Sequence, residues 1–291
     1  MRALCCFSIV VFLSVSYFSD LCHAQYLTGP IAGALGGAGR AASDDGEQIF
    51  LNPAALVHGS PFTSSIVYEG GREADNEKTD RLAIGLSDNS QDLVVSGGYS
   101  YVRRTDEITG MPDVKEDFHQ FALAKFVAKH VSMGGTFSYR VSDIDGEREK
   151  HDQWDVSVGT LYNPTPDFAV AAVVYNLASR DDEIPKTVQN LDQVAVGLHY
   201  IYLPMFRFRF DLVQQMVRNP DAKMNYQAGI ESKLKNFLVT RVGFNKDDLA
   251  DRDFLTFGLG FDGPRLKFDY SYRKNLDGGA LHGVDLRMPF W

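Results

Sequence analysis

Cysteine is nearly absent from this chain of 291 residues, and its three cysteines, Cys5, Cys6 and Cys22, all lie near the N-terminus. Downstream of Cys22 the chain therefore offers neither a disulfide framework nor a cysteine-based metal site. Small secreted scaffolds usually need such staples. The remaining chain is long enough to form one large domain without them.

The first 24 residues have the layout of a cleaved export signal. Arg2 is followed by an apolar stretch from Ala3 to Phe18, and the segment ends in Cys22-His23-Ala24. We predict cleavage after Ala24. Lipidation of Cys22 is the weaker interpretation because Leu21, rather than a small residue, precedes it. An uncleaved anchor is also weaker because the apolar stretch is short.

Long hydrophobic runs and basic stripes are missing as well. No stretch of about eighteen apolar residues follows residue 24, which excludes a helical membrane protein. The net charge is −9, and no cluster of basic residues offers a nucleic-acid surface. The acidic residues concentrate in segments that we interpret as solvated loops rather than calcium sites, at 69–80, 143–149, 181–183 and 247–253.

The histidines do not form a catalytic or metal-binding pattern. Those that follow the signal are His58, His119, His130, His151, His199 and His282. None has a serine and an acid at the spacing of a known nucleophilic motif. No two of them lie two residues apart, as a metal site on one strand face would require. We therefore expect neither an enzyme nor a bound metal or cofactor.

The chain does contain a regular alternation of apolar and polar residues. From Phe206 to Asp211 rings and charges alternate without a break, which predicts a strand whose two faces meet different media. The pattern recurs from residue 61 onward and divides into about fourteen strands. We place them near 62–70, 79–87, 92–103, 116–127, 131–141, 152–162, 168–177, 191–202, 205–217, 223–232, 237–244, 253–261, 265–273 and 280–290.

The connections between these strands alternate in length. Long polar connections are expected at 70–78, 104–115, 142–151, 178–190 and 245–252, and short ones at 88–91, 128–130, 163–167, 203–204, 233–236 and 262–264. Antiparallel barrels of the bacterial outer membrane have long loops outside and short turns at the periplasmic rim. A sandwich is not expected to sort its loops in this way. We therefore predict an all-β fold, a transmembrane antiparallel β-barrel over residues 61–291.

The alternation also assigns the two faces of the barrel wall. Apolar residues such as Phe206, Phe208 and Phe210 would face lipid. Charges on the opposite face would point into the lumen, where they must be wet or paired. A lattice of salt bridges that holds the barrel shut is favoured over a selectivity filter. The lumen-facing set includes Arg207, Arg209, Asp211, Arg265, Lys267 and Asp269.

Residues 25–60 differ from the barrel in composition. The stretch Gly29–Arg40 is too rich in glycine for a stable strand or helix and too apolar for a solvated tail. We predict that it packs inside the barrel as a hatch. At the end of the segment, Pro53 forces Asn52 out of a helical conformation and toward a turn.

These features together resemble a known family. The glycine-rich stretch, then Ala41-Ala42-Ser43-Asp44-Asp45 and Phe50-Leu51-Asn52-Pro53-Ala54-Ala55-Leu56, then the barrel, resemble the FadL family of outer-membrane transporters for long-chain fatty acids and aromatic hydrocarbons. The order is also similar to that of the PorV-like barrels of type IX secretion. The resemblance implies that Asn52, Pro53 and Ala54 hold the hatch, while Gly36, Gly37 and Gly39 let its backbone pack tightly against the wall.

The chain departs from the transporters in two respects. It is much shorter, with exterior connections of about five to thirteen residues, whereas longer loops build the first capture site in the family. The expected lumen face is charged, whereas a fatty-acid pocket should be mainly apolar. Two functions therefore stand as alternatives. One is passive transport of small hydrophobic molecules across the outer membrane, and the other is a structural or partner-binding barrel of PorV type in secretion or envelope assembly.

The expected partners follow from this placement. They are outer-membrane lipid, the barrel-assembly machinery, and either a small hydrophobic ligand or a protein at the exterior loops; no nucleic acid is expected.

The last residues generate a first testable prediction. The side chains Val284, Leu286, Met288 and Phe290 alternate, and Phe290-Trp291 is similar to the terminal aromatic signal that the barrel-assembly machinery reads. Deletion of residues 288–291 is expected to leave unfolded protein in the periplasm. Cell fractionation and heat-modifiable migration on gels measure this. Normal amounts of folded barrel in the outer membrane after the deletion would contradict the assignment.

Overall fold

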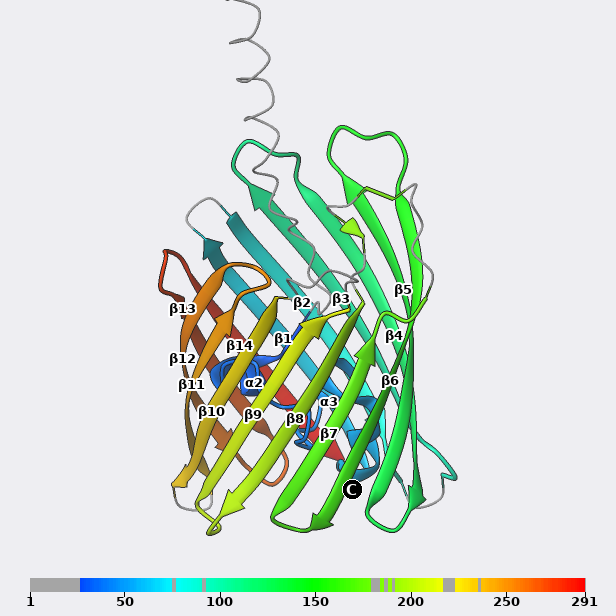
Figure 1. Cartoon of the computed structure of the whole chain (residues 1–291), viewed down its shortest axis with the longest axis vertical. Helices are drawn as coiled ribbons and strands as arrows, with labels where there is room; N and C mark the ends of the chain where they lie inside the picture. The colour runs from blue at the N-terminus through cyan, green and yellow to red at the C-terminus, as the bar shows by residue number, and fades with distance from the viewer. Residues whose placement is uncertain are drawn as a thin grey trace, which may run out of the picture.

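The computed structural model describes residues 27–74, 77–90, 93–178, 184–185, 188–189, 192–216, 223–234 and 237–290. Within these ranges fourteen antiparallel strands form a closed barrel, in which consecutive strands pair and β14 pairs with β1 (Figure 1). The expected fold class and strand number are therefore confirmed. The predicted export signal, residues 1–24, and Trp291 of the predicted assembly signal lie outside the described residues.

The elements follow one another in the order of the sequence. Three short helices come first: α2 (Pro30–Ala34), α3 (Gln48–Leu51) and the 3-10 helix η1 (Pro53–His58) in the described part of the chain. The strands are β1 (Phe62–Ala74), β2 (Glu77–Asp88), β3 (Ser96–Ile108), β4 (Val114–Ala128), β5 (Val131–Ile144), β6 (His151–Thr165), β7 (Phe168–Tyr175), β8 (Gln193–Tyr202), β9 (Phe206–Gln215), β10 (Met224–Leu234), β11 (Leu238–Asp247), β12 (Arg252–Asp262), β13 (Lys267–Asn275) and β14 (Ala280–Phe290). None of the helices described is both long and apolar enough to cross a membrane.

The outer face of the wall is an apolar belt. On β9, Phe208 and Phe210 are 37% and 42% exposed, whereas Arg209 between them is 3% exposed. Successive side chains of a strand point to opposite faces, so the rings point outward and the guanidinium inward. Exposed apolar side chains recur on β2, β12 and β13, including Leu82, Ile84, Leu86, Phe257, Leu259 and Phe268. A contiguous apolar surface of this kind fits a lipid environment rather than water.

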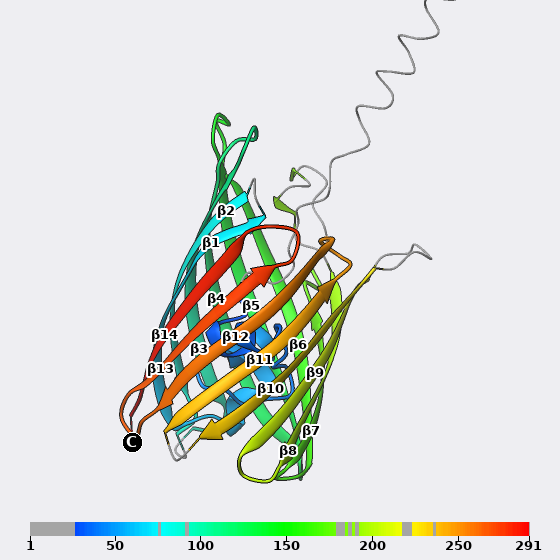
Figure 2. The ribbon, with the colours of Figure 1, turned by 90° about the vertical axis from the view of Figure 1, so that its left-hand side faces the viewer.

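The strands extend further than the sequence indicates at one rim. Long loops are expected at 70–78 and 104–115, but β1 continues to Ala74, β2 begins at Glu77 and β3 continues to Ile108. Both faces of these hairpins carry polar residues, so an alternation of apolar and polar residues cannot reveal them. The hairpins that join β3 to β4 and β5 to β6 rise above the rest of the wall (Figures 1 and 2).

Two other connections also differ from the expected lengths. The sequence places a strand from residue 92 onward, whereas β3 begins only at Ser96, so that the turn after β2 is longer than predicted. Residues 216–223 separate β9 from β10, whereas the alternation predicts a shorter gap, residues 218–222. The C-terminal end of β14 lies at the rim that carries the short turns (Figure 2).

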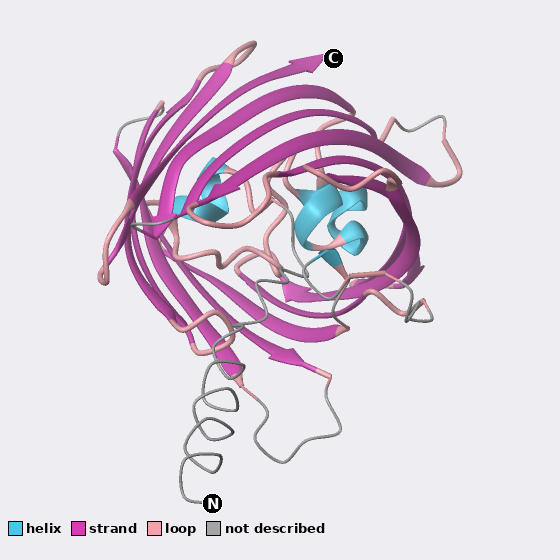
Figure 3. Ribbon diagram, turned by 90° about the horizontal axis from the view of Figure 1, so that it is seen from above, coloured by secondary structure: helices cyan, strands magenta, loops and turns pink. Residues whose placement is uncertain are grey.

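The hatch segment, residues 27–60, lies inside the ring of strands (Figure 3). Its apolar side chains pack against the inner wall in several buried clusters. Leu27 and Phe50 pack in one buried cluster with residues of β1 to β4, such as Val67 and Phe118. Ala54 packs in another with residues of β6 and β7. At the level of these clusters the interior of the barrel is therefore occupied by chain rather than by an open pore.

The position of the rings on β9 predicts a depth-dependent effect of charge. Phe210 lies near the middle of the strand and Phe206 at its start. A charge facing lipid at the membrane midplane destabilises a barrel by about 2–4 kcal/mol, and near the interface by about 0–1 kcal/mol. We expect Phe210→Arg to lower the free energy of unfolding by the larger amount and Phe206→Arg by the smaller.

Reversible unfolding of the barrel in lipid vesicles measures both values. Phe210→Leu is the matched control, because it keeps an apolar side chain at the same place. Equal effects of the two arginine variants would argue against the membrane-facing assignment of this face.

Candidate functional site

Glu47 joins α2 to the start of α3 within the hatch segment. Its carboxylate oxygens accept hydrogen bonds from the backbone N–H groups of Ile31 (2.7 Å) and Ala32 (2.9 Å), in the first turn of α2. These donors have no partner within a helix, and an acidic group stabilises them. Burial, together with the nearby carboxylates of Asp44 and Asp285, raises the pKa of Glu47 well above its ordinary value. The contact fixes the glycine-rich stretch against the start of α3.

Asn52 organises the turn that precedes η1. Its side-chain oxygen accepts from the N–H of Ala54 (3.0 Å), which caps η1, where Pro53 occupies the first turn. Its amide nitrogen donates to the carbonyls of Arg40 (2.9 Å) and Thr160 (3.2 Å). The Ser132 hydroxyl on β5 donates to the Ala54 carbonyl at 2.8 Å. Asn52 and Ala54 thus connect the hatch segment to itself, to β6 and to β5.

Arg40 is the main ionic link between the hatch segment and the wall. Its guanidinium lies 3.0 Å from an Asp211 carboxylate oxygen on β9, and both side chains are 1% exposed. It also donates to Tyr175 (3.0 Å) on β7 and Gln227 (2.8 Å) on β10. Burial alone lowers the pKa of Arg40, but Tyr175 and Asp211 raise it, so the residue stays charged. One side chain therefore reaches three strands.

Asp211 also holds the backbone of the hatch segment. The same carboxylate oxygen accepts from the N–H groups of Gly39 (2.9 Å) and Arg40 (3.0 Å). Asp211 belongs to the lumen-facing set that the alternation identifies, but Arg40 was not recognised as its partner. A single arginine at the end of an apolar, glycine-rich stretch was the available signal, because a charge in such a segment needs a partner when the segment is buried.

Glycines on both sides allow the hatch segment to touch the wall. Gly36 has a φ of +71°, and a Cβ there would lie 2.2 Å from the Phe244 carbonyl oxygen of β11. Facing it, a Cβ on Gly243 would lie 2.3 Å from the Leu35 carbonyl carbon. Side chains at these positions would push the two backbones apart. Wall glycines whose Cβ would meet the hatch segment within about van der Waals range are Gly85, Gly98, Gly134, Gly159, Gly197, Gly229, Gly243, Gly258 and Gly283.

The other glycines of the expected hatch motif have individual contacts. Gly37 has a φ of +93° and lies against the Gln227 side chain, while a Cβ on Gly39 would lie 2.9 Å from a Leu51 methyl carbon. A Cβ on Gly39 would thus first meet the hatch segment itself, while the Gly39 N–H donates to Asp211 of the wall. The wall glycines were not identified from the sequence, because glycine on a strand by itself does not show what approaches it.

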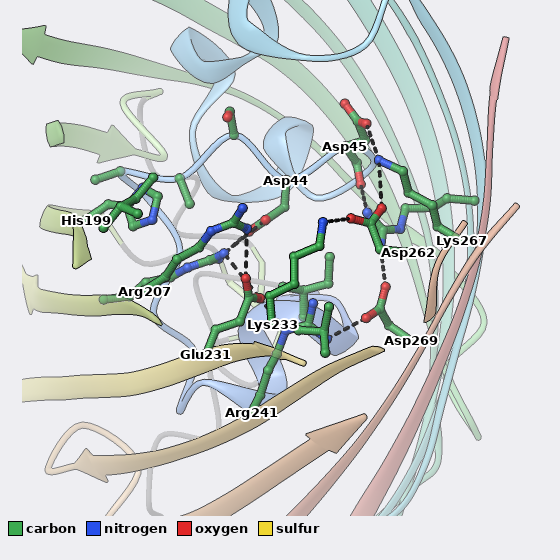
Figure 4. A pocket seen from close by; sticks show the side chains of 18 of the residues that line it. Asp44, Asp45, His199, Arg207, Glu231, Lys233, Arg241, Asp262, Lys267 and Asp269 are labelled. Carbon is green, nitrogen blue, oxygen red and sulfur yellow. Dashed lines mark hydrogen bonds and ion pairs between the residues drawn. The ribbon is translucent and has the colours of Figure 1, made fainter. Parts of the chain in front are cut away.

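Below the hatch segment, toward the rim with the short turns, charged side chains line a cavity of about 320 Å³ (Figure 4). Arg209 forms an ion pair with Asp44 of the hatch segment. Arg241 bridges Glu231 (2.7 Å) and Asp269 (2.5 Å). Within the described residues this lining carries six cationic and five anionic side chains: Arg207, Arg209, Lys233, Arg241, Lys267 and Arg287, with Asp44, Asp45, Glu231, Asp262 and Asp269.

The lowered pKa of Asp44 determines the pH range over which its ion pair with Arg209 stabilises the fold. Burial alone raises the pKa of Asp44, but the Arg209 guanidinium outweighs burial and holds this pKa well below its ordinary value. A carboxyl with a lowered pKa in the folded state stabilises the fold above its ordinary pKa and loses that contribution as the pH falls through the lowered value. The pair is therefore intact at neutral pH.

The expected lumen-facing residues occupy different environments. Arg209, Asp211 and Asp269 are buried on the inner face. Arg207 reaches Glu231 at 2.8 Å, and Lys267 lies 3.5 Å from Asp45 of the hatch segment. Arg265 is the exception: it is exposed and lies in the turn before β13 rather than on a strand. The alternation Arg265, Lys267, Asp269 continues beyond the strand end, where periodicity no longer reports a face.

A second charged group lies on the opposite side of the hatch segment. Arg252 of β12 contacts Glu73 of β1 (2.8 Å) and Glu77 of β2 (2.5 Å), so it bridges strands that are not neighbours. Arg140 and Glu116 pair at 3.0 Å. These residues belong to an upper charged cluster comprising Glu69, Glu73, Glu77, Arg81, Arg104, Asp106, Glu116, Arg140, Arg252 and Arg273.

In the described part of the chain, no group of three or more acidic, histidine or cysteine side chains is arranged to hold a metal.

Comparison with known proteins identifies the fold. No protein-family model matches the chain, and neither does any curated protein. Among solved structures, the CymD monoaromatic hydrocarbon channel superposes with a TM-score of 0.70 at 13% identity, over 90% of this chain and 97% of that one. A FadL homologue from Pseudomonas aeruginosa gives 0.68 at 11% identity, over 91% and 98%. The toluene transporter TodX from Pseudomonas putida gives 0.64 at 9% identity, over 91% and 98%. The chain thus has the fold of the FadL-like outer-membrane transporters.

The close approach at β5 predicts how the hatch segment responds to added volume. A Cβ on Gly134 would lie 2.6 Å from the Ala54 nitrogen and the Pro53 carbonyl carbon, whereas one on the adjacent Gly135 would meet nothing nearer than 3.7 Å. Overpacking of this kind costs about 1–3 kcal/mol. We expect Gly134→Ala to loosen the Asn52 turn and Gly135→Ala to leave it unchanged.

Limited proteolysis at Arg40 of the folded barrel provides the measurement, because Arg40 is buried while the hatch segment is seated. The two variants make the same change on opposite faces of one strand. Equal protection of Arg40 in both would show that the contact at Gly134 does not hold the segment in place.

Proposed function

We propose that this chain is an outer-membrane channel for small hydrophobic molecules, closed by its N-terminal hatch segment. The observation that carries the proposal is the seating of that segment across the lumen through Arg40 and Asp211. The fold likeness to hydrocarbon channels supports the same assignment. The predicted export signal and the apolar belt agree with a location in the outer membrane.

The distribution of side chains in the lumen suggests which part of the interior would conduct. The hatch segment covers an apolar inner wall on β1 to β4 that includes Val67, Val102 and Phe118. Displacement of Leu27 and Phe50 would uncover this apolar half, and a pathway for hydrophobic molecules requires such a lining. In the charged half, the pairs of Arg241 with Glu231 and Asp269 join wall residues to one another and would stay in place.

Opening would require loss of the contacts of Arg40. Removing one partner of a buried ion pair costs on the order of 3–5 kcal/mol, because the other charge is left without compensation. The Arg40 and Asp211 side chains form such a buried ion pair, so this cost applies to the loss of either one. The wall would keep its closed ladder of strands during such a change, since the hatch segment contributes no strand to the barrel.

A second candidate is a structural or partner-binding barrel of the outer membrane. The upper charged cluster favours it, because Arg252 bridges Glu73 and Glu77 across the interior and narrows the path for an apolar solute. The cavity next to the hatch segment is also lined largely by charged groups. In this alternative the hatch segment stabilises the barrel, and the raised hairpins present the surface that a partner would contact.

Uptake of toluene by lipid vesicles that contain the purified full-length protein tests the proposal. We compare the wild-type protein, Arg40→Gln, and a variant lacking residues 29–54, and record single-channel conductance in planar bilayers in parallel. A gated channel predicts measurable uptake by the wild-type protein. It also predicts faster uptake and more frequent openings for Arg40→Gln, because the seated hatch segment is destabilised.

Asp152→Asn is the control for a change of charge, because Asp152 is exposed on β6. Heat-modifiable migration confirms that each variant is folded. Toluene uptake equal to that of protein-free vesicles for the wild-type protein and Arg40→Gln, with only lower stability in the deletion variant, would contradict the channel and favour the structural barrel.

A further inference from the structure

An apolar groove lies at the rim with the short turns. It occupies about 870 Å³ between the turn that joins β8 to β9 and the facing ends of β10 and β11. Its apolar lining is well exposed: Met205 and Phe237 are each 48% exposed, and Leu234 and Leu238 are 41% and 40% exposed. Pro204 completes the apolar lining. Leu234 and Leu238 pair across the β10–β11 hairpin, so the groove continues the apolar outer face of that hairpin.

Two cations border this groove. Arg207 and Lys233 line it, and both also line the charged cavity inside the barrel. Their side chains are 35% and 28% exposed, so they remain accessible from the rim. No acidic side chain is among the described residues that line the groove. An apolar trough with two accessible cations at its inner end is therefore built into the rim.

Each cation has one carboxylate partner and retains the capacity to bind another acceptor. Arg207 donates to Glu231 at 2.8 Å through one terminal nitrogen, which leaves its other terminal nitrogen for a further acceptor. Lys233 donates to Asp262 at 2.7 Å. Glu231 also pairs with Arg241 at 2.7 Å, and Asp262 lies 3.6 Å from Lys267. An anion could therefore engage Arg207 and Lys233 while both carboxylates keep another cationic partner.

We propose that this groove binds an anionic glycerophospholipid of the adjoining membrane leaflet, with its phosphate between Arg207 and Lys233 and its acyl chain along Met205, Leu234 and Phe237. The charge complementarity selects this occupant. A neutral hydrocarbon gains nothing from two cations, and a small soluble anion gains nothing from the apolar walls. A zwitterionic phospholipid brings its own cation next to Arg207 and Lys233. The inference is independent of transport, since it concerns a lipid that stays in the membrane.

Native mass spectrometry of the full-length protein in detergent, titrated with phosphatidylglycerol or phosphatidylcholine, tests the site. The wild-type protein is expected to retain phosphatidylglycerol more tightly. Each cation near a membrane surface contributes about fivefold to the attraction of anionic lipid. Arg207→Gln and Lys233→Gln should therefore each reduce phosphatidylglycerol binding by about that factor and leave phosphatidylcholine binding unchanged.

Lys129→Gln is the matched control. Lys129 is exposed in the turn between β4 and β5 at the same rim, and it does not line the groove. The variant should bind phosphatidylglycerol as the wild-type protein does. An equal loss in Lys129→Gln would show a general attraction of the rim and overturn the site. Equal retention of both lipids by the wild-type protein would also overturn it.

A second set of measurements tests the apolar part of the site. Phe237→Ser should weaken phosphatidylglycerol and phosphatidylcholine alike, because it removes a wall that acyl chains of both lipids contact. Soluble glycerol phosphate at millimolar concentration should not displace phosphatidylglycerol. Full displacement, or no effect of Phe237→Ser, would assign the cations to a free anion and contradict a lipid site. Heat-modifiable migration of every variant confirms that the barrel remains folded in these comparisons.

Discussion

The width of the lumen is the constraint on which the rest of this structure depends. A barrel of about eight strands can be filled by its own side chains, and wider ones leave space that must hold water, loops or a plug. The described residues form fourteen strands, so alternate side chains alone cannot close the interior. The hatch segment supplies the missing volume, and its backbone is accommodated by glycines on the wall such as Gly134, Gly159 and Gly243.

Filling the lumen with chain creates a second demand, since buried backbone and charged groups need partners. The two sides of the wall provide these partners in different ways. Along β1 to β4 the inner face is apolar at the level of Leu27 and Phe50, so contact there is hydrophobic. On β9, Asp211 receives the Arg40 guanidinium and two backbone N–H groups. Apolar packing on β1 to β4 is not directional and does not fix the position of the hatch segment. The hydrogen bonds of Asp211 are directional and fix that position.

The charged side chains of the lumen are paired in two groups, one on each side of the hatch segment. The upper charged cluster joins strands that are distant in the sheet through Arg252, and the lower group surrounds the cavity near Arg241. Both groups continue to the rims, where charges become accessible. At the rim with short turns, Arg207 and Lys233 are shared between the lumen and an apolar groove. The same alternation that places charge inside therefore brings it next to the lipid-facing belt where the strands end.

The sequence by itself determined the fold class and the strand number, because a two-residue period is local and each strand reports its own two faces. It also identified Asp211 and Asn52 as residues of interest. It could not pair Arg40 with Asp211, which lie 171 positions apart, or show that Gly134 faces Pro53. Arg265 was misplaced because periodicity does not reveal where a strand begins. Only the tertiary structure decided these contacts, since they depend on which wall position the hatch segment meets once the barrel closes. No local sequence pattern encodes which residues, far apart in the chain, come to face each other.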